Sequence, residues 1–335
     1  MTGNGAAPVS AASGWARLAG RHPLLAWLDA ALRGSGQVIF MDNPLTGLLN
    51  FVALCWGAFA GGTTLAVAIG AVVGNLVSTA AAYPLRADRA ALRRGLCGFN
   101  GLLVGAGIPT FLAHTPLMWL LLVFAAAGST VVTLAIGRWF DARKLPGLTF
   151  PFVLTTWLVL LAAYRLPGLP IAALPPAELA SQASAGGGLA SIDAFIRAAL
   201  RGVAQVFFVD NPVSGAIFLL ALAVESRWCA ALAAFGAAAA TACALAMGAD
   251  ANVVAHGLWS YSAVLTAPAI GCVFLKPGPR SLLYGAAATL FTVIVQGATA
   301  TFAGTLGIPA LTFPFVLTTW LFLLAWRGLG TDAGQ

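Results

Sequence analysis

A fifteen-residue segment occurs twice in this chain, and this duplication restricts the possible folds more than any other feature. The two copies, 148–162 and 311–325, are identical at fourteen of fifteen positions. Each is an apolar stretch in which a threonine, Thr149 or Thr312, precedes a proline by two residues. Because a duplication brings equivalent side chains to the seam between two similar halves, the repeat predicts one site that is lined twice, typical of a pathway through a membrane.

The composition indicates that lipid, and not water, is the main solvent of this chain. Of its 335 residues, 60% are hydrophobic and 8% are charged, whereas a soluble domain carries about 25% charged residues. Uncharged stretches of about twenty residues recur along the chain, and that length crosses a bilayer. The stretches predict an all-α integral membrane protein with ten spanning helices, near 45–61, 63–83, 95–113, 117–137, 148–165, 212–225, 228–248, 253–275, 282–303 and 308–326.

Two further blocks repeat in the same order. Residues 37–47 match residues 205–215 at seven of eleven positions, and 95–105 align more weakly with 257–267. The three offsets are 168, 162 and 163 residues, so each half carries the full set. We therefore divide the chain into an N-terminal tail without the features of a cleaved signal (1–21), a first half (22–165), a proline- and glycine-rich linker (166–191), a second half (192–327) and a C-terminal tail (328–335).

The number of crossings predicts that the two halves are inverted. The eight residues from Gln37 to Pro44 would span roughly 12 Å as a helix, against a hydrocarbon thickness of about 30 Å, so we expect a re-entrant pore segment there and at its repeat. Five spans then remain in each half, and an odd number inverts the second half. This count leaves fourteen of seventeen basic residues on one side, against ten if the segments crossed fully. The excess of positive charge favours the inverted arrangement with both termini cytoplasmic.

Polar residues that recur in both halves are the candidate site residues, because polar groups within a membrane are unfavourable unless they line a cavity or meet a partner. Gln37 and Gln205 open the short blocks, and Thr149 and Thr312 open the last helix of each half. Their oxygens, with carbonyls freed by the nearby prolines, would form a ladder of neutral acceptors. Hydrogen bonding between helices is the alternative reading of each.

Aromatic residues follow the same pattern. Phe40 and Phe208 lie three positions after each glutamine, and Phe99 pairs with Tyr261 in the third block. Two flat faces would bound a slot for a planar neutral solute with many N–H donors. Ordinary packing is the alternative for any one of the twenty phenylalanines.

Other polar residues favour structural roles. In Asp42-Asn43-Pro44 and its repeat at 210–212, asparagine before proline is typical of a helix start, with the aspartate complementing the helix dipole. Binding of a coupling cation by Asp42 and Asp210 is the alternative.

The five cysteines form no C-x-x-C pair and the three histidines are far apart. We expect packing cysteines, no metal site and no cofactor. The basic residues lie in short loops, so we expect no nucleic-acid partner.

These blocks resemble those of the urea transporter family of bacteria and vertebrates, from about residue 22 to 327. The resemblance implies a homotrimer in which each protomer passes urea passively through a narrow filter between inverted halves. Carried over by position, Gln37 and Gln205 would be filter hydrogen-bonders, Thr149 and Thr312 mid-pore hydroxyls, and Phe40, Phe208 and Phe99 slot walls. Leu103 and Leu265 would be apolar sides of the middle of the pore.

Three departures from the family pattern stand out. Tyr261 replaces the phenylalanine found at Phe99, Ser262-Ala263 replace Asn100-Gly101, and aspartate precedes Asn-Pro in both halves. One end of the filter is therefore expected to be more polar or differently shaped, which makes small amides other than urea candidate solutes.

Passive permeation of urea is the leading functional hypothesis, with ions excluded by the free energy of their desolvation. No nucleophile elbow, phosphate loop or supported carboxylate pair points to an enzyme. The alternatives are an aquaporin-like water or ammonia channel, suggested by the two Asn-Pro motifs, and a cation-coupled transporter using Asp42 and Asp210. High alanine and glycine content favours a bacterial protein, hence the cytoplasmic (inner) membrane.

Overall fold

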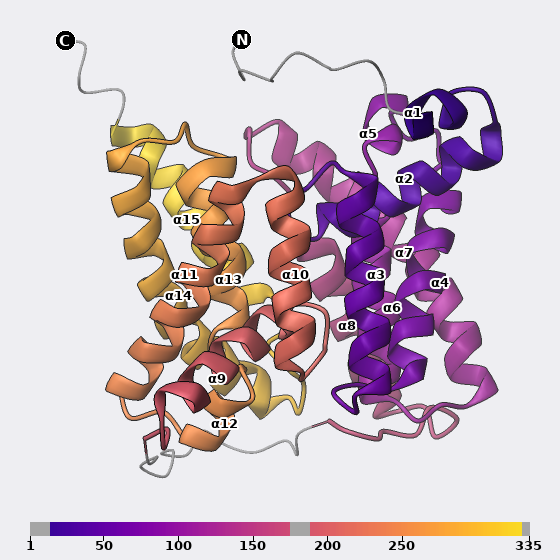
Figure 1. Cartoon of the computed structure of the whole chain (residues 1–335). Coiled ribbons are helices and arrows are strands. Elements are labelled where there is room, and N and C mark those ends of the chain that lie inside the picture. Colours follow the sequence, from indigo (N-terminus) through magenta and orange to yellow (C-terminus); the bar gives the residue numbers. More distant parts are fainter. Residues whose placement is uncertain (1–13, 175–187, 330–335) are drawn as a thin grey trace.

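The computed structural model describes residues 14–174 and 188–329, and these residues form helices joined by turns (Figure 1). Their one isolated antiparallel bridge pairs Leu112 with Ile171. Parts of the predicted tails and the centre of the predicted linker lie outside the described residues. An all-helical fold is therefore confirmed for the described part of the chain.

Helices overlap every predicted span, although several are shorter than predicted and the span at 253–275 is divided. Those of the first half are α1 (Gly14–Ala19), α2 (Pro23–Gln37), α3 (Pro44–Phe59), α4 (Leu65–Ala81), α5 (Arg89–Arg93), α6 (Phe99–Phe111), α7 (Pro116–Asp141) and α8 (Phe150–Ala163). Those of the second half are α9 (Ile192–Gln205), α10 (Pro212–Glu225), α11 (Arg227–Ala246), α12 (Ala251–Ala255), α13 (Tyr261–Pro268), a π-helical turn (Ala269–Val273), α14 (Pro279–Thr305) and α15 (Phe313–Leu329). By length and composition α7, α11 and α14 are long and apolar enough to cross a membrane, and the others that match predicted spans are shorter apolar helices.

The Asn-Pro motifs begin helices, as the sequence predicted. The Asn43 side-chain oxygen accepts the backbone N–H of Leu45 at 2.8 Å, and Pro44 occupies the first position of α3. Asn211 accepts the backbone N–H groups of Val213 and Ser214 in the same way before α10. These bonds satisfy donors that the first turn of a helix leaves unpaired.

The segment at 37–44, predicted to be re-entrant, is a turn between two helices, and its re-entrance stays a prediction. Gln37 is the last residue of α2, and the following residues make a tight turn into α3. The shortest buried helices lie elsewhere: α6 has 13 residues, and its positions 100–109 are all buried. A helix of that length extends about 20 Å, which is less than the hydrocarbon thickness of about 30 Å. Hydrophobicity alone does not separate such a helix from a full span.

Glycines bring α4 and α6 into close contact. A Cβ atom on Gly105 would lie 2.0 Å from the carbonyl oxygen of Gly70, and one on Gly74 would lie 2.1 Å from that of Gly101. Both helices therefore carry glycines four residues apart on the contact face, the spacing that allows apolar helices to pack backbone to backbone. This packing positions the first residues of α6 against the start of α8.

Helices α3 and α10 join the two halves. Thr46 on α3 donates to the Ala221 carbonyl at 2.8 Å, and Ser214 on α10 donates to the Ala53 carbonyl at 2.8 Å. The two donors are 168 residues apart in the sequence, and so are the two acceptors, so the bonds are equivalent. In Figure 1 the equivalent pairs α2 and α9, and α5 and α12, lie toward opposite ends of the molecule.

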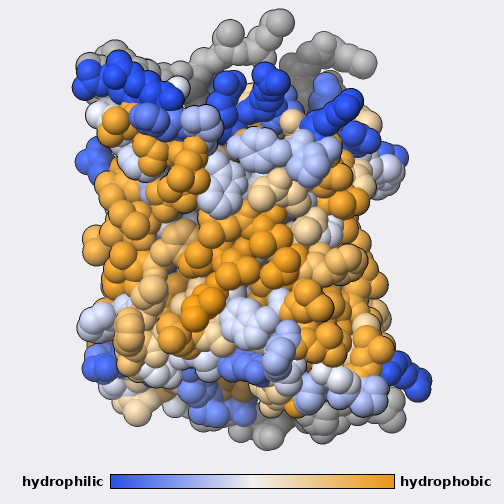
Figure 2. All heavy atoms as spheres, turned by 90° about the vertical axis from the view of Figure 1, so that its right-hand side faces the viewer, coloured by the Kyte–Doolittle hydropathy of each residue, from blue (hydrophilic) through white to orange (hydrophobic). Residues whose placement is uncertain are grey.

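The outer surface carries a broad hydrophobic belt. In Figure 2 this belt lies between hydrophilic bands at the two ends. Exposed side chains include Phe59 at 84%, Phe124 at 77% and Leu283 at 75% relative exposure. Exposed apolar side chains gathered in a belt mark a surface that contacts apolar material, and this one suits contact with lipid.

Candidate functional site: two equivalent cavities

The glutamine of each short block ends a helix, and the phenylalanine lies on the strained turn that follows. After α2 ends at Gln37, the backbone of Phe40 adopts a left-handed conformation with φ 67°, and Phe208 has φ 60°. This region is uncommon for bulky residues. Leu148 and Leu311, directly before the two threonines, have φ 51° and φ 50°. Strain of this kind persists where packing over-determines the backbone, often at functional sites.

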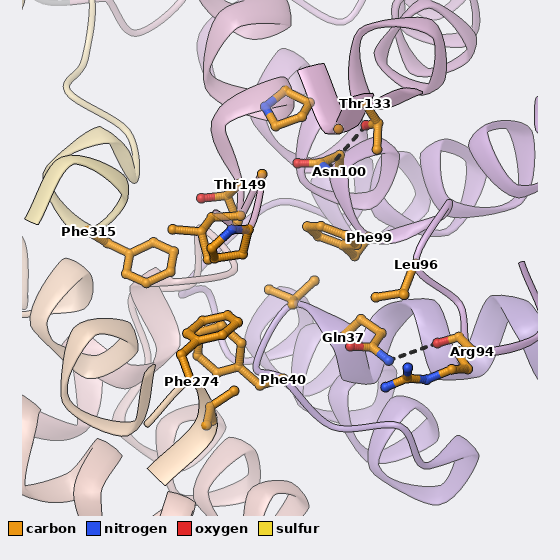
Figure 3. Close-up of a pocket in the computed structure, with 17 residues that line it drawn as sticks. Gln37, Phe40, Arg94, Leu96, Phe99, Asn100, Thr133, Thr149, Phe274 and Phe315 are labelled. Carbon is orange, nitrogen blue, oxygen red and sulfur yellow. Dashed lines mark hydrogen bonds between the residues drawn. The ribbon is translucent and has the colours of Figure 1, made fainter. Parts of the chain in front are cut away.

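The first cavity has a volume of about 310 Å³ and is lined by residues from both halves. It contains four predicted site residues, Gln37, Phe40, Phe99 and Thr149 (Figure 3). The second half contributes three apolar walls, Val273, Phe274 and Phe315.

The second cavity has a volume of about 280 Å³ and repeats the arrangement with the halves exchanged. It contains the other four paired residues, Gln205, Phe208, Tyr261 and Thr312. The first half contributes walls that include Phe111 and Phe152. The structure thus divides eight predicted residues into two equivalent sets of four.

Each glutamine is anchored through its amide nitrogen. Gln37 Nε2 donates to the Arg94 carbonyl at 2.9 Å, and Gln205 Nε2 donates to the His256 carbonyl at 3.0 Å. Figure 3 shows the bond from Gln37. Because the nitrogen is held by the backbone, each amide oxygen remains an acceptor.

The aromatic walls pack in equivalent ways in the two cavities. The Phe40 and Phe274 rings lie 5.9 Å apart at 84°, and so do Phe208 and Phe111. Phe40 also meets Phe315 edge to face, as Phe208 meets Phe152. Edge-to-face contacts at these distances are favourable and fix ring orientation.

The sequence interpretation missed four of these rings. Phe111 and Phe274 are 163 residues apart, as are Phe152 and Phe315. The repeat offset is the signal that would have identified them, together with the expectation that each cavity draws on both halves.

The two threonines meet between the cavities. Thr149 lines the first cavity and Thr312 the second, and their Oγ1 atoms are 2.7 Å apart. Both residues are buried. A single hydrogen bond therefore links equivalent residues of the two halves, in a position where each hydroxyl can donate and accept.

The two predicted leucines occupy equivalent buried positions. Leu103 on α6 and Leu265 on α13 are 0% and 1% exposed. Neither lines these two cavities. Their assignment to the middle of a pore stays a prediction.

The aspartates of the short blocks are held in ion pairs. Asp42 meets Arg33 at 2.9 Å and Arg94 at 3.0 Å. Asp210 meets Arg201 at 3.1 Å and also His256. Neither aspartate lines the two cavities, and within the described residues no three His, Cys, Asp or Glu side chains cluster as metal ligands. Each carboxylate therefore already has basic partners.

Known proteins match this chain over nearly its full length. The sequence profile of the family described as Urea transporter matches residues 28–327. Urea transporter 1 of Rattus norvegicus is 31% identical over 315 residues, which cover 90% of this chain and 77% of the relative. Urea transporter 1 of Ovis aries is 30% identical over 308 residues, with the same coverage. This chain belongs to the urea transporter family.

Membership of the urea transporter family confirms the resemblance that the repeated blocks indicated. It identifies the chain as an integral membrane protein of a transport family, in agreement with its apolar surface (Figure 2). The two cavities of this urea transporter family member contain the repeated residues on which the resemblance was based.

Proposed function

We propose that this protein passes urea, and small amides of similar shape, down their gradients through a path that joins the two cavities. The observation that carries this proposal is the Thr149–Thr312 contact at 2.7 Å, because it links two equivalent cavities at their common boundary. The family match and the names of the relatives support urea as the solute.

The mechanism requires only exchange of hydrogen bonds. In each cavity the edge of a planar solute would meet a glutamine oxygen and a threonine hydroxyl, while the rings cover its faces. A solute at the midpoint would replace the threonine–threonine bond with bonds of its own. Ions would be excluded because the apolar walls cannot replace their hydration.

The proposed architecture places two inverted halves around this path. Short, buried α6 and its counterpart, α13 with the π-helical turn, suit the role of re-entrant segments better than the turns at 37–44 and 205–212. The location of α2 and α9 toward opposite ends in Figure 1 supports the inversion. A homotrimer, cytoplasmic termini and an inner-membrane location complete the proposal, on the family resemblance and the charge distribution.

Flux into proteoliposomes tests the function. Purified protein should equilibrate labelled urea much faster than protein-free vesicles, to the same final level with or without a sodium or proton gradient. Accumulation above equilibrium that depends on a gradient would instead indicate a coupled transporter. Water or ammonia flux without urea flux would indicate the aquaporin-like alternative.

A further inference from the structure

The two cavities differ chemically at one pair of equivalent positions. Tyr261 stands where the first half has Phe99, and its hydroxyl donates to the backbone carbonyl of Leu311 at 2.6 Å. Leu311 lines the second cavity, and its counterpart Leu148 lines the first. Within the described residues, the Leu148 carbonyl oxygen accepts no hydrogen bond. The Leu148 carbonyl oxygen is therefore free where the equivalent Leu311 carbonyl oxygen is occupied.

A buried relay holds the tyrosine in place. Gln296 on α14 donates from Nε2 to the Tyr261 hydroxyl at 3.1 Å, and Ser262 donates to Gln296 Oε1 at 3.0 Å. Ser262 is 0% and Gln296 6% exposed. Each bond orients the next, so the relay directs the tyrosine proton to the Leu311 carbonyl.

The first half has the complementary set of residues. Asn100 takes the place of Ser262, and Thr133, 163 residues before Gln296, takes the place of the glutamine. Asn100 accepts the Phe152 backbone N–H at 3.1 Å and donates to Thr133 at 3.3 Å. The residue with the side-chain amide is thus Asn100 on α6 in the first half and Gln296 on α14 in the second half. The Tyr261 hydroxyl therefore has a polar partner on α14, and Phe99 has no hydroxyl to be held.

We propose that Tyr261, positioned by Gln296 and Ser262, determines how strongly the second cavity holds the solute. Its hydroxyl bonds the Leu311 carbonyl, so this cavity offers one acceptor fewer to solute N–H groups than the first. The pathway is then asymmetric, with weaker binding in the second cavity. The inference rests on the proposed function and extends it to a difference between the two ends.

Equilibrium exchange of labelled urea tests the inference through its half-saturating concentration. In Tyr261→Phe the Leu311 carbonyl becomes available, and we expect this concentration to fall roughly fivefold, the effect of one net hydrogen bond. Acetamide, with one amino group in place of two, should gain less than urea. The acetamide-to-urea selectivity should therefore fall.

A triple variant addresses the polar groups that Tyr261→Phe leaves unpaired. Tyr261→Phe, Ser262→Asn and Gln296→Thr together copy the first-half set, so each buried polar group regains a partner. This variant should also lower the half-saturating concentration. The mirrored change, Phe99→Tyr with Asn100→Ser and Thr133→Gln, should raise it, because the Leu148 carbonyl becomes occupied.

The outcomes separate the two proposals. If wild-type protein moves urea and none of these variants shifts half-saturation by more than twofold, the role of Tyr261 is refuted and the channel function stands. If wild-type protein moves no urea, both proposals are refuted. A shift of equal size for urea and acetamide would also contradict the role, because it would not depend on the number of N–H donors.

Discussion

Replacement of the two central threonines by valine is the most direct test of the pathway. Valine preserves the shape of threonine and carries a methyl group in place of the hydroxyl. Thr149 and Thr312 are 3% and 4% exposed, and a hydrogen bond of 2.7 Å joins their hydroxyl oxygens. The substitution therefore removes polarity from the boundary between the cavities with little change in packing.

The expected magnitude follows from the hydrogen bonds that a passing solute would lose. One hydrogen bond contributes about 1 kcal/mol net, and 1.4 kcal/mol corresponds to a factor of ten. Each single variant should therefore reduce urea permeability about fivefold. If the two hydroxyls act independently, the double variant should reduce it about thirtyfold, and a smaller combined effect would indicate that they act as a unit.

The assay is urea efflux from proteoliposomes followed by light scattering, normalised to the amount of folded protein. The matched control is Thr156→Val with Thr319→Val. These threonines lie on α8 and α15, the helices that Thr149 and Thr312 directly precede. They are related by the same 163-residue offset and are both 0% exposed, but they do not line the two cavities. Control and wild type should agree within twofold. Unchanged flux in the Thr149 and Thr312 double variant would refute the reasoning that solute passes between these hydroxyls.

Three further predictions concern coupling and packing. Asp42→Asn should leave urea flux independent of sodium and proton gradients, measured as uptake with and without each gradient; a gradient-driven component lost in the variant would contradict the channel. Gly105→Ala should lower the thermal unfolding temperature in detergent, because overpacking costs about 1–3 kcal/mol. Gly128→Ala is the control and should not lower it, because a Cβ atom there would have no neighbour within 4 Å. Equal effects of the two substitutions would contradict the close contact of α4 and α6. The Cys229 and Cys272 sulfur atoms are 3.1 Å apart. Mild oxidation should therefore link these two cysteines in preference to other pairs, which mass analysis of the peptides would show. Random pairing would argue against this packing.

The repeat made much of the site predictable, because equivalent residues at equal offsets have equivalent places. Gln37 and Thr149 were identified from recurrence alone, and both line one cavity with Phe40 and Phe99. Phe274 was not identified, because it lies in the other half and no single motif connects it with Phe40. The contact between these rings depends on how the two halves pack.

Helix length was the main point at which sequence reasoning failed. The apolar stretch at 95–113 contains enough residues to cross a bilayer, but α6 has only 13 residues, with turns before it and an extended residue after it. Its glycines let it pack inside the protein against α4. Hydrophobicity reports that a segment avoids water, and it does not report whether lipid or protein replaces the water.

The sequence by itself determined the two-fold organisation, the all-helical membrane character and the identity of eight paired residues in the two cavities, because these follow from repetition, composition and helix-start signals. Only the tertiary structure decided that each cavity is closed by rings from the opposite half, that Thr149 bonds Thr312 and that Tyr261 occupies the Leu311 carbonyl. The physical reason is that these contacts join residues from 50 to 275 positions apart. Their geometry is set by the packing of whole helices, which no local pattern encodes.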